Sequence, residues 1–498
     1  MIKQYLILAC WLLIFPVYTF SSVLYSDDIG NRIALTFDSD HAQNISQETL
    51  DKASALGINI VEISDLSSLE QLSFDRFTLF LRHDLKYPTS QKLTGSKEQI
   101  LQSTRVLLRN SEQRYPGQAV ALSVFSFPNE SSSAFIRSAS ALTDSLSQFT
   151  DLPFYYHSSR PRTKTLPENF SFYSGLIRAG APTEDVTSEV VLFKPAENPR
   201  QNIQTFEYLL NTMVQKPESI IIIPAGWFAK SLETNSGFGQ LLKSHIQGNN
   251  VEFPLPASKS DAPPINWSVV LLAIIWMSFA LHYKTQPGYS AILMRYFTAH
   301  SFFVNDIKEH RLRSSAPPFV IIFQHALLTG LCFYVIANTF LSPMGLDALS
   351  SYFPGVFIEG YQKTSFFVLG TILALLSHLI SVFWLYILNK QATHISQVLN
   401  LYSWPLHINL VLVTLLVITS QAGGSELWIF IIAAAFILVW FLAFNFAAVD
   451  CAKFLEKFGA LYLIFTVGLH LVLLFAIVVL FFNLPFILEP FQLAITLS

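Results

Sequence analysis

The chain has 498 residues, of which 52% are hydrophobic and only 13% are charged. A soluble protein carries roughly 25% charged residues. Here the charged residues are dense between Asp27 and Asp261 and become sparse after Pro317. One part of the chain therefore suits water and the other suits lipid, which predicts an integral membrane protein in contact with the bilayer. The net charge of -3 gives no indication of a nucleic-acid partner.

The first 22 residues are typical of an export signal. Lys3 precedes an apolar stretch from Tyr5 to Phe20, and the small residues that follow offer a cleavage site after Ser21. An uncleaved signal anchor is the alternative, because Tyr5 to Leu24 is about as long as the 20 residues that cross a bilayer. Both interpretations place residues 27–258 outside the cytoplasm, in the periplasm if the membrane is a bacterial inner membrane.

Residues 27–258 are predicted to form a separate α/β domain. The three cysteines are Cys10, Cys332 and Cys451, so this domain has no disulfide and depends on its own core. Short apolar runs alternate with amphipathic helical patterns, which indicates parallel βαβ units. The expected strands are Ile33 to Phe37, Asn59 to Ile63, Phe77 to Leu81, Ala119 to Phe125, Pro153 to Tyr156, Ser171 to Ile177, Glu189 to Phe193 and Ser219 to Pro224.

The expected helices are Gln47 to Leu56, Lys97 to Glu112, Ser133 to Phe149 and Pro199 to Val214. About eight strands over this length favour a (β/α)8 barrel, with a doubly wound open sheet as the alternative. The barrel should be irregular near Ser171 to Phe193, where no clear helix separates two strands.

The segment from Ala53 to Ile63, a helix that ends at Gly57 before a strand, resembles the helix-to-strand passage of glycoside hydrolase barrels. In the large retaining clan of that family an Asn-Glu acid follows strand four, a Glu nucleophile follows strand seven and a Trp follows strand eight. The resemblance implies Glu130, Glu197 and Trp227 in these roles. The two carboxyl groups would have to lie about 5 Å apart. The alternative is that Glu130 lies in a loop before a helix and that Glu197 lies at a helix entry.

A second polar cluster follows the first and third strands. The run from Thr36 to His41, which contains Asp38 and Asp40, resembles the opening motif of polysaccharide deacetylases. It departs from that motif at Ser39, and the sequence has no His-x-x-x-His to complete a metal site. His83 and Asp84 also end a strand. Since barrel active sites lie at the carboxyl ends of strands, Asp38, Asp40, His83 and Asp84 are candidate ligand-binding residues, with ordinary solvated loop charge as the alternative.

A polar linker, residues 259–266, precedes a bundle of about six transmembrane helices. The expected spans are Trp267 to Tyr283, Phe319 to Leu341, Ser365 to Leu388, Trp404 to Thr419, Leu427 to Val449 and Ala460 to Phe482. Positive charges are concentrated in the loops on one side of these spans, which predicts that this side is cytoplasmic and that the tail, residues 484–498, lies outside. Residues 284–317 are basic and aromatic and are either an interfacial helix or a plain loop.

The last five spans, residues 318–483, with Tyr402-Ser-Trp-Pro405 opening one of them, resemble the Yip1-type five-helix membrane domain. That resemblance implies membrane organisation and protein partners rather than a reaction. Four of the histidines within spans can lie in the middle or inner half of the membrane: His325, His378, His407 and His470. They are compatible with a proton path or with neutral hydrogen bonds between helices. The absence of central Asp, Glu, Lys or Arg argues against a transporter.

The sequence thus predicts a cell-envelope membrane protein whose exported barrel binds a glycan polymer or a protein partner. A membrane-tethered glycoside hydrolase is the second hypothesis. A transporter or channel that uses the intramembrane histidines is the third. Neither a cofactor nor a metal is expected, because no phosphate-binding loop, Gly-x-Ser-x-Gly elbow or Cys-x-x-Cys occurs in the sequence.

Overall fold

A computed structural model describes thirteen stretches of the chain: residues 29–37, 45–66, 69–160, 169–180, 190–216, 219–235, 237–249, 251–256, 265–286, 288–312, 314–389, 391–455 and 457–498. The predicted signal, residues 1–22, and most of the predicted linker lie outside these stretches. The chain divides into two compact units, Met1–Ala262 and Pro263–Ser498. Each unit is considered by itself.

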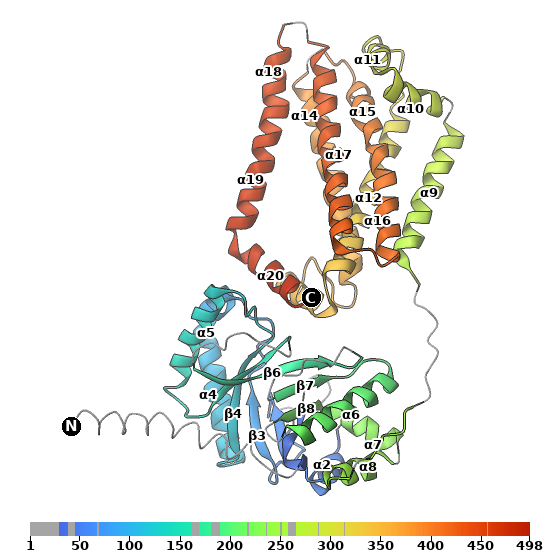
Figure 1. Ribbon diagram of the computed structural model, residues 1–498. Coiled ribbons are helices and arrows are strands. Elements are labelled where there is room, and N and C mark those ends of the chain that lie inside the picture. Colours follow the sequence, from blue (N-terminus) through green and yellow to red (C-terminus); the bar gives the residue numbers. More distant parts are fainter. Residues whose placement is uncertain are drawn as a thin grey trace, which may run out of the picture. The chain divides into compact units, whose positions relative to one another are not determined.

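The first unit is a closed barrel of eight parallel strands in sequential order (Figure 1). The barrel closes because β1 pairs with β8, with Ile33 in register with Ile221. The prediction of a (β/α)8 barrel is confirmed, and the alternative of an open sheet is wrong. The strands are β1 (Ile33–Phe37), β2 (Ile60–Ile63), β3 (Thr78–Arg82), β4 (Ala119–Ser126), β5 (Phe154–Ser158), β6 (Phe170–Arg178), β7 (Val190–Lys194) and β8 (Ile220–Pro224).

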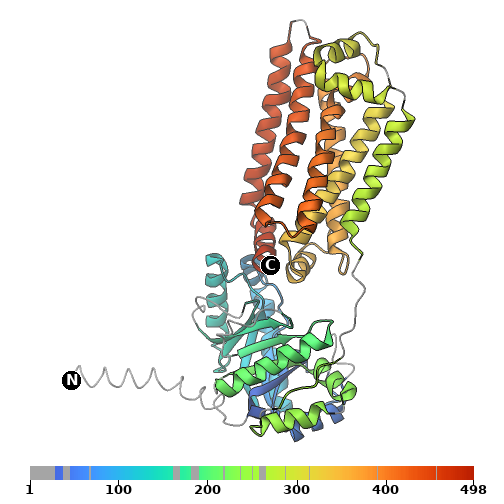
Figure 2. The same ribbon diagram turned by 45° about the vertical axis from the view of Figure 1, so that its right-hand side comes forward.

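Helices surround the barrel unevenly (Figure 2). Within the described residues no helix separates β2 from β3, β5 from β6 or β6 from β7. The predicted irregularity from Ser171 to Phe193 falls largely on residues 181–189, which lie outside the described residues. The helices of this unit are η1 (Ile29–Arg32), α2 (Gln47–Ala55), α3 (Ser90–Gly95), α4 (Lys97–Arg114), α5 (Ser133–Leu146), α6 (Pro199–Gln215), α7 (Ala225–Thr234) and α8 (Phe238–Ile246).

Alternate residues of each strand face two different environments, because side chains point to opposite faces of a strand in turn. In β3, Leu79 and Leu81 belong to the large apolar cluster between the strands and the outer helices. Phe80 lies on the other face and contacts Tyr155 and Phe172 inside the barrel, where the last two rings stack with their centroids 4.8 Å apart. The barrel interior is thus filled with aromatic side chains and is not an open channel.

The second unit contains six helical runs that are long and apolar enough to cross a membrane. This finding is consistent with an integral membrane protein. The runs are Trp267–Thr285, Ala316–Phe340, Gln362–Ile387, Ile395–Gln421, Glu426–Ala452 and Gly459–Asn483. In order, they comprise α9 (Trp267–Thr285), α12 (Ala316–Phe340), α14 (Gln362–Ile387), α15 (Ile395–Ser403) with η3 (Trp404–His407) and α16 (Ile408–Gln421), α17 (Glu426–Ala452), and α18 (Gly459–Leu463) with η4 (Ile464–Gly468) and α19 (Leu469–Asn483).

Small residues allow two of these helices to approach closely. A Cβ atom at Gly330 of α12 would lie only 2.5 Å from the Phe367 carbonyl oxygen of α14, and one at Gly370 of α14 would lie 2.9 Å from the Phe333 ring. In lipid, where apolar burial gives no net drive between helices, such close contact is a main source of association. Glycine at these two positions therefore permits the α12–α14 contact.

Four shorter helices complete the second unit: α10 (Tyr289–Thr298), α11 (His300–Lys308), α13 (Pro343–Tyr352) and α20 (Pro485–Thr496). Residues 284–317 thus contain two helices, which resolves the choice between helix and loop. The predicted C-terminal tail is also largely helical. Leu493 and Ala494 of α20 are fully buried, and the Ser342 hydroxyl donates a hydrogen bond to the Leu497 carbonyl at 2.9 Å.

Candidate functional site

The predicted cluster of Asp38, Asp40, His83 and Asp84 is only partly described. Asp38 and Asp40 lie outside the described residues, and Asp84 is exposed. His83 follows the outward-facing Leu81, and its Nε2 lies 2.7 Å from the Ser103 hydroxyl of α4. Burial lowers the pKa of His83, an effect that the charge of Asp84 partly offsets. His83 therefore faces the helix layer and not the interior of the barrel.

Trp227 also belongs to the helix layer. It lies in α7, directly after β8, as the predicted strand numbering requires. Its ring packs edge-on against Phe193 of β7 and Phe206 of α6, with centroids 5.0 and 5.1 Å away, and against Phe238 of α8. These contacts explain the tryptophan as part of the packing between strands and helices.

Glu130 and Glu197 follow β4 and β7 of the closed barrel, as the hydrolase resemblance requires. Burial raises the pKa of Glu130, and Ser158, Arg160 and Tyr156 oppose that rise. Tyr156 and Ser158 alternate along β5 with the inward-facing residues, so these contacts place Glu130 on the helix side of β5. Glu197 is exposed in the turn before α6. Among the described residues, no contact brings the two carboxyl groups together, so their pairing stays a prediction.

A different carboxylate occupies the inside of the barrel. Glu62 of β2 is completely buried, and both of its oxygens have partners. Oε1 accepts a hydrogen bond from the Tyr155 hydroxyl at 2.6 Å and lies 2.8 Å from Nε2 of His157. Oε2 accepts hydrogen bonds from the Thr36 hydroxyl at 2.6 Å and from the Arg82 guanidinium at 3.2 Å. Four strands, β1, β2, β3 and β5, thus contribute to one buried polar network.

The charges of this network determine its protonation. Burial alone would raise the pKa of Glu62, but the positive charges of His157 and Arg82 and the hydrogen bonds from His157 and Thr36 outweigh burial and hold that pKa well below its usual range. Burial and the negative charge of Glu62 raise the pKa of Tyr155 well above its usual value. Glu62 is therefore an anion whose available acceptor positions are used by donors within the barrel.

A row of rings leads from this network to the rim formed by the carboxyl ends of the strands. The His157 ring lies 6.3 Å from the Phe127 ring, which lies 6.0 Å from the Tyr87 ring. Tyr87 follows β3 and Phe127 follows β4, and both are half-buried. The Phe127 amide donates a hydrogen bond to the His157 carbonyl at 2.6 Å, and the Tyr87 amide donates one to the Ser126 carbonyl at 2.9 Å.

The backbone at both rim aromatics is strained. Tyr87 has φ = 55° and Phe127 has φ = 59°, a region that side chains other than glycine rarely adopt. Such conformations cost about 1–3 kcal/mol each and persist where the surrounding structure fixes them, often at binding sites. Here the two amide hydrogen bonds and the pairing of Lys86 with Ser126 fix them. The rim of β3, β4 and β5 therefore holds two aromatic rings in a defined position.

Burial and strand alternation, not a sequence motif, indicate the residues of this site. Glu62 stands in the run Ile-Val-Glu-Ile, where a charge in a buried strand requires partners. Arg82 directly precedes His83, and only the alternation of β3 decides that Arg82 points inward. The partners on β5, Tyr155 and His157, lie two residues apart, as residues on one face of a strand must.

The second unit contains a buried chain of hydrogen bonds between helices. The Asn409 side-chain NH2 donates to the Phe436 carbonyl at 3.1 Å, and its nitrogen lies 2.7 Å from His325 Nε2. His325 Nε2 therefore accepts, and its Nδ1–H donates to His378 Nε2 at 3.0 Å. By the same reasoning, His378 Nδ1–H donates to the Tyr402 hydroxyl at 2.7 Å. This series of hydrogen bonds fixes one neutral tautomer for each of the two histidines.

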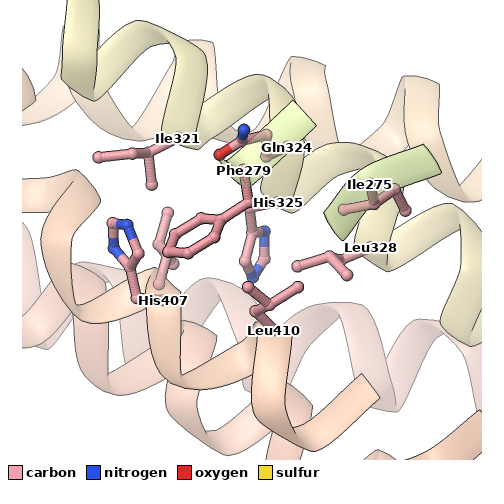
Figure 3. A pocket seen from close by; sticks show the side chains of 9 residues that line it. Ile275, Phe279, Ile321, Gln324, His325, Leu328, His407 and Leu410 are labelled. Carbon is pink, nitrogen blue, oxygen red and sulfur yellow. The ribbon is translucent and has the colours of Figure 1, made fainter. Parts of the chain in front are cut away.

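The other two of the four candidate histidines are His407 and His470. His407 contacts the Tyr289 hydroxyl through Nε2, and its Nδ1 lies 2.9 Å from the Trp404 carbonyl. A cavity of about 20 Å³ lies between α9, α12 and the η3–α16 segment, with Gln324, His325 and His407 as its polar lining (Figure 3). Its size suits about one water molecule. His470 packs against aromatic rings, including Phe444 at 4.1 Å.

The polar chain does not continue along the helices. After His325 the buried side chains of α12 include Leu331 and Val335, and after Asn409 those of α16 include Val413 and Leu416. These apolar side chains pack against one another in a single cluster. The arrangement accounts for His325, His378 and His407 as hydrogen-bonded contacts between helices, and among the described residues these apolar side chains interrupt the polar chain.

Comparison of the chain with protein-family models, with curated proteins and with solved structures finds no match. The resemblances to glycoside hydrolases, polysaccharide deacetylases and the Yip1 family therefore stay predictions. Among the described residues, no group of three or more His, Cys, Asp or Glu side chains is arranged to hold a metal ion. The candidate site is accordingly defined by its own geometry: the Glu62 network and the rim aromatics Tyr87 and Phe127.

Proposed function

We propose that this protein is a membrane-anchored receptor whose barrel binds a glycan polymer outside the cytoplasm. The observation that supports the proposal is the row of rings from Tyr87 through Phe127 to His157, which ends at the buried Glu62 network. Ligand sites combine apolar or aromatic surfaces with a few polar groups in fixed positions, and they lie at this end of parallel barrels. A sugar ring, with one apolar face and a rim of hydroxyl groups, suits that combination.

The carboxylates favour binding over hydrolysis. A catalytic nucleophile or base needs an oxygen that can approach the substrate, but both oxygens of Glu62 already accept hydrogen bonds within the barrel. Glu130 contacts the helix side of β5, and Glu197 is exposed in the turn before α6. A membrane-tethered glycoside hydrolase that uses Glu130 and Glu197 is therefore the second proposal. A transporter is supported less, because apolar side chains interrupt the polar chain of the bundle.

The location in this proposal rests on the charge pattern of the chain. The apolar stretch after Lys3 would export the barrel, and the basic loops of the bundle would remain in the cytoplasm. In a bacterium this arrangement places the barrel in the periplasm and the bundle in the inner membrane. The barrel is then exposed to the polysaccharides of the envelope, while the bundle keeps it at the membrane surface.

The test is binding of the full-length protein, in lipid nanodiscs, to insoluble cell-wall polysaccharide and to an array of soluble oligosaccharides. Phe127→Ala removes the central ring of the row and should weaken binding roughly fivefold to tenfold, the effect of losing about 1–1.5 kcal/mol of ring contact. Tyr208→Ala is the matched control, because Tyr208 is an aromatic residue of α6 with 38% of its surface exposed. That variant should bind like the native protein.

Two outcomes would contradict the proposal. Absence of glycan binding by the native protein would remove its basis, and equal binding by the Phe127→Ala and native proteins would place the site elsewhere. Release of reducing ends from the bound glycan, lost in Glu130→Gln and Glu197→Gln, would favour the hydrolase instead.

A further inference from the structure

The segment between the first two membrane helices has an apolar face that the bundle does not cover. In α10 and α11, Tyr296 and Phe303 are buried in a cluster with Trp404 of the bundle. On the exposed side, Met294 and Phe302 have 63% and 70% of their surface accessible. Two short helices therefore pack against the bundle on one side and present large apolar side chains on the other.

The position of this segment follows from the chain. α9 ends at Thr285 and α12 begins at Ala316, so α10 and α11 connect two helices of membrane-crossing length at the same end of the bundle. The loop after α17, with Lys453, belongs to the same end because the intervening helices alternate in direction. Near the end of α9 from which the segment leaves, Leu281 is also 64% exposed. Helices with this combination of faces lie in the interfacial layer of a bilayer.

The charges of this segment are mostly positive. Residues 284–312 contain four cations, Lys284, Arg295, Lys308 and Arg311, and two anions, Asp306 and Glu309, a difference of +2. Asp306 pairs with Arg295 and with Arg311 at 3.5 Å, and Glu309 pairs with Arg311 at 2.6 Å. Within the described residues no ion pair is found for Lys284 or Lys308. These two lysines are the cations left for an external anion.

The opposite end of the bundle provides an internal comparison. It also carries short helices, α13 and α20, with exposed apolar side chains such as Ile495, which is 61% exposed. Its charges are reversed, however: among the described residues, the loops and short helices at that end contain Asp347, Glu359, Glu426 and Glu489, and Lys363 lies in the first turn of α14. The two ends thus offer similar apolar surfaces with opposite charge.

Phe297 of α10 is also exposed, with 49% of its surface accessible. We infer that α10 and α11 form an interfacial anchor that binds anionic phospholipid headgroups, with Phe297 and Phe302 inserted among the acyl chains and Lys284 and Lys308 paired with headgroup phosphates. Basic residues beside a membrane surface each favour anionic lipid, by roughly fivefold per residue. The exposed rings supply the apolar part of the attachment. This anchor is independent of what the barrel binds.

The experiment uses the full-length protein, with Cys10→Ser, in nanodiscs. The native Cys332 and Cys451 are buried, so an environment-sensitive fluorophore can be attached selectively at Phe302→Cys or, as the matched control, at Ile495→Cys. Nitroxide-labelled phosphatidylglycerol and nitroxide-labelled phosphatidylcholine are then compared as quenchers. At position 302 the anionic lipid should quench several-fold more than the neutral lipid. At position 495 the two lipids should quench equally.

Lys284→Gln together with Lys308→Gln should abolish the excess quenching at position 302 while leaving quenching by the neutral lipid in place. Both lysines are exposed, so this change leaves the packed face of the helices intact. Equal quenching by the two lipids in the native sequence would overturn the anionic preference, and the absence of quenching by either lipid would overturn insertion. Removal of the excess by millimolar inorganic phosphate would show that the lysines bind free phosphate and would also overturn the proposal.

Discussion

Replacement of Glu62 by Gln should strongly destabilise the barrel. The substitution keeps the volume of the side chain but removes its charge and turns one acceptor oxygen into a donor. A single acceptor oxygen then remains for all four partners: the Tyr155 and Thr36 hydroxyls, the His157 ring and the Arg82 guanidinium. Arg82, with only 6% of its surface exposed, would lose the charge of the carboxylate with which it pairs.

The expected magnitude follows from the loss of that buried ion pair. Removing one partner of a buried ion pair costs about 3–5 kcal/mol. For a domain of this size, 1 kcal/mol lowers the melting temperature by about 2–4 °C, so the variant should melt roughly 6–20 °C below the native domain. Such a loss is a large part of the about 5–15 kcal/mol that stabilises a typical domain.

The assay is urea unfolding of residues 27–258, followed by circular dichroism. Glu197→Gln is the matched control, because that carboxylate is exposed, and it should change the free energy of unfolding by less than about 0.5 kcal/mol. Combining Glu62→Gln with Arg82→Met removes both charges of the ion pair and should recover about 2 kcal/mol relative to additive losses. A cost below about 1 kcal/mol for Glu62→Gln alone would refute the reasoning, since it would mean that the network is hydrated.

Four further results are expected. His157 and Arg82 outweigh burial and hold the folded pKa of Glu62 below the unfolded value of about 4.3. The stabilisation by Glu62 is therefore complete above about pH 5 and is lost as the pH falls toward the folded pKa. Between pH 5 and 3 the native domain should lose more unfolding free energy than Glu62→Gln, and equal losses would contradict this. Residues 27–258 should melt cooperatively in reducing buffer, since their barrel closes on itself without cysteines, and a molten product would mean that the bundle completes the fold. His378→Phe should destabilise the full chain in detergent by about 1–3 kcal/mol, because both hydrogen-bonded neighbours lose a partner, and an unchanged thermal transition would contradict this. A reporter active only outside the cytoplasm should function when fused after Ser498, whereas activity of a cytoplasmic reporter there would overturn the six-span topology.

The fold could be predicted because its signals are periodic. Apolar strands that alternate with amphipathic helices indicate a parallel barrel, and long apolar runs indicate membrane helices. The boundaries were less predictable: the fourth run was expected from Trp404, but helix begins at Ile395 and continues through Pro405 in a 3-10 turn. In sequence, Pro405 looks like the start of a helix. In the structure, Leu401 and Tyr402 pack into the bundle, and the helix begins on the N-terminal side of the proline.

The candidate site was harder to predict, because motif reasoning selects residues by type and order and does not determine which way a side chain points. His83 and Glu130 follow the expected strands, yet His83 contacts the helix layer and Glu130 contacts the outer side of β5. Glu62 and Arg82 belong to no motif and are defined only by contacts between strands far apart in sequence. Positive φ at Phe127 has no sequence signal, because it depends on hydrogen bonds from a neighbouring strand.

Hydrogen exchange of the full-length protein, with and without a bound glycan, tests the central claim most directly. The account predicts that the glycan slows amide exchange in the rim segments that contain Tyr87 and Phe127. Exchange around Trp227, which packs between strands and helices, should be unchanged. Protection confined to the turn before α6, around Glu197, or to surfaces away from the carboxyl ends of β3, β4 and β5 would contradict a glycan site at this rim.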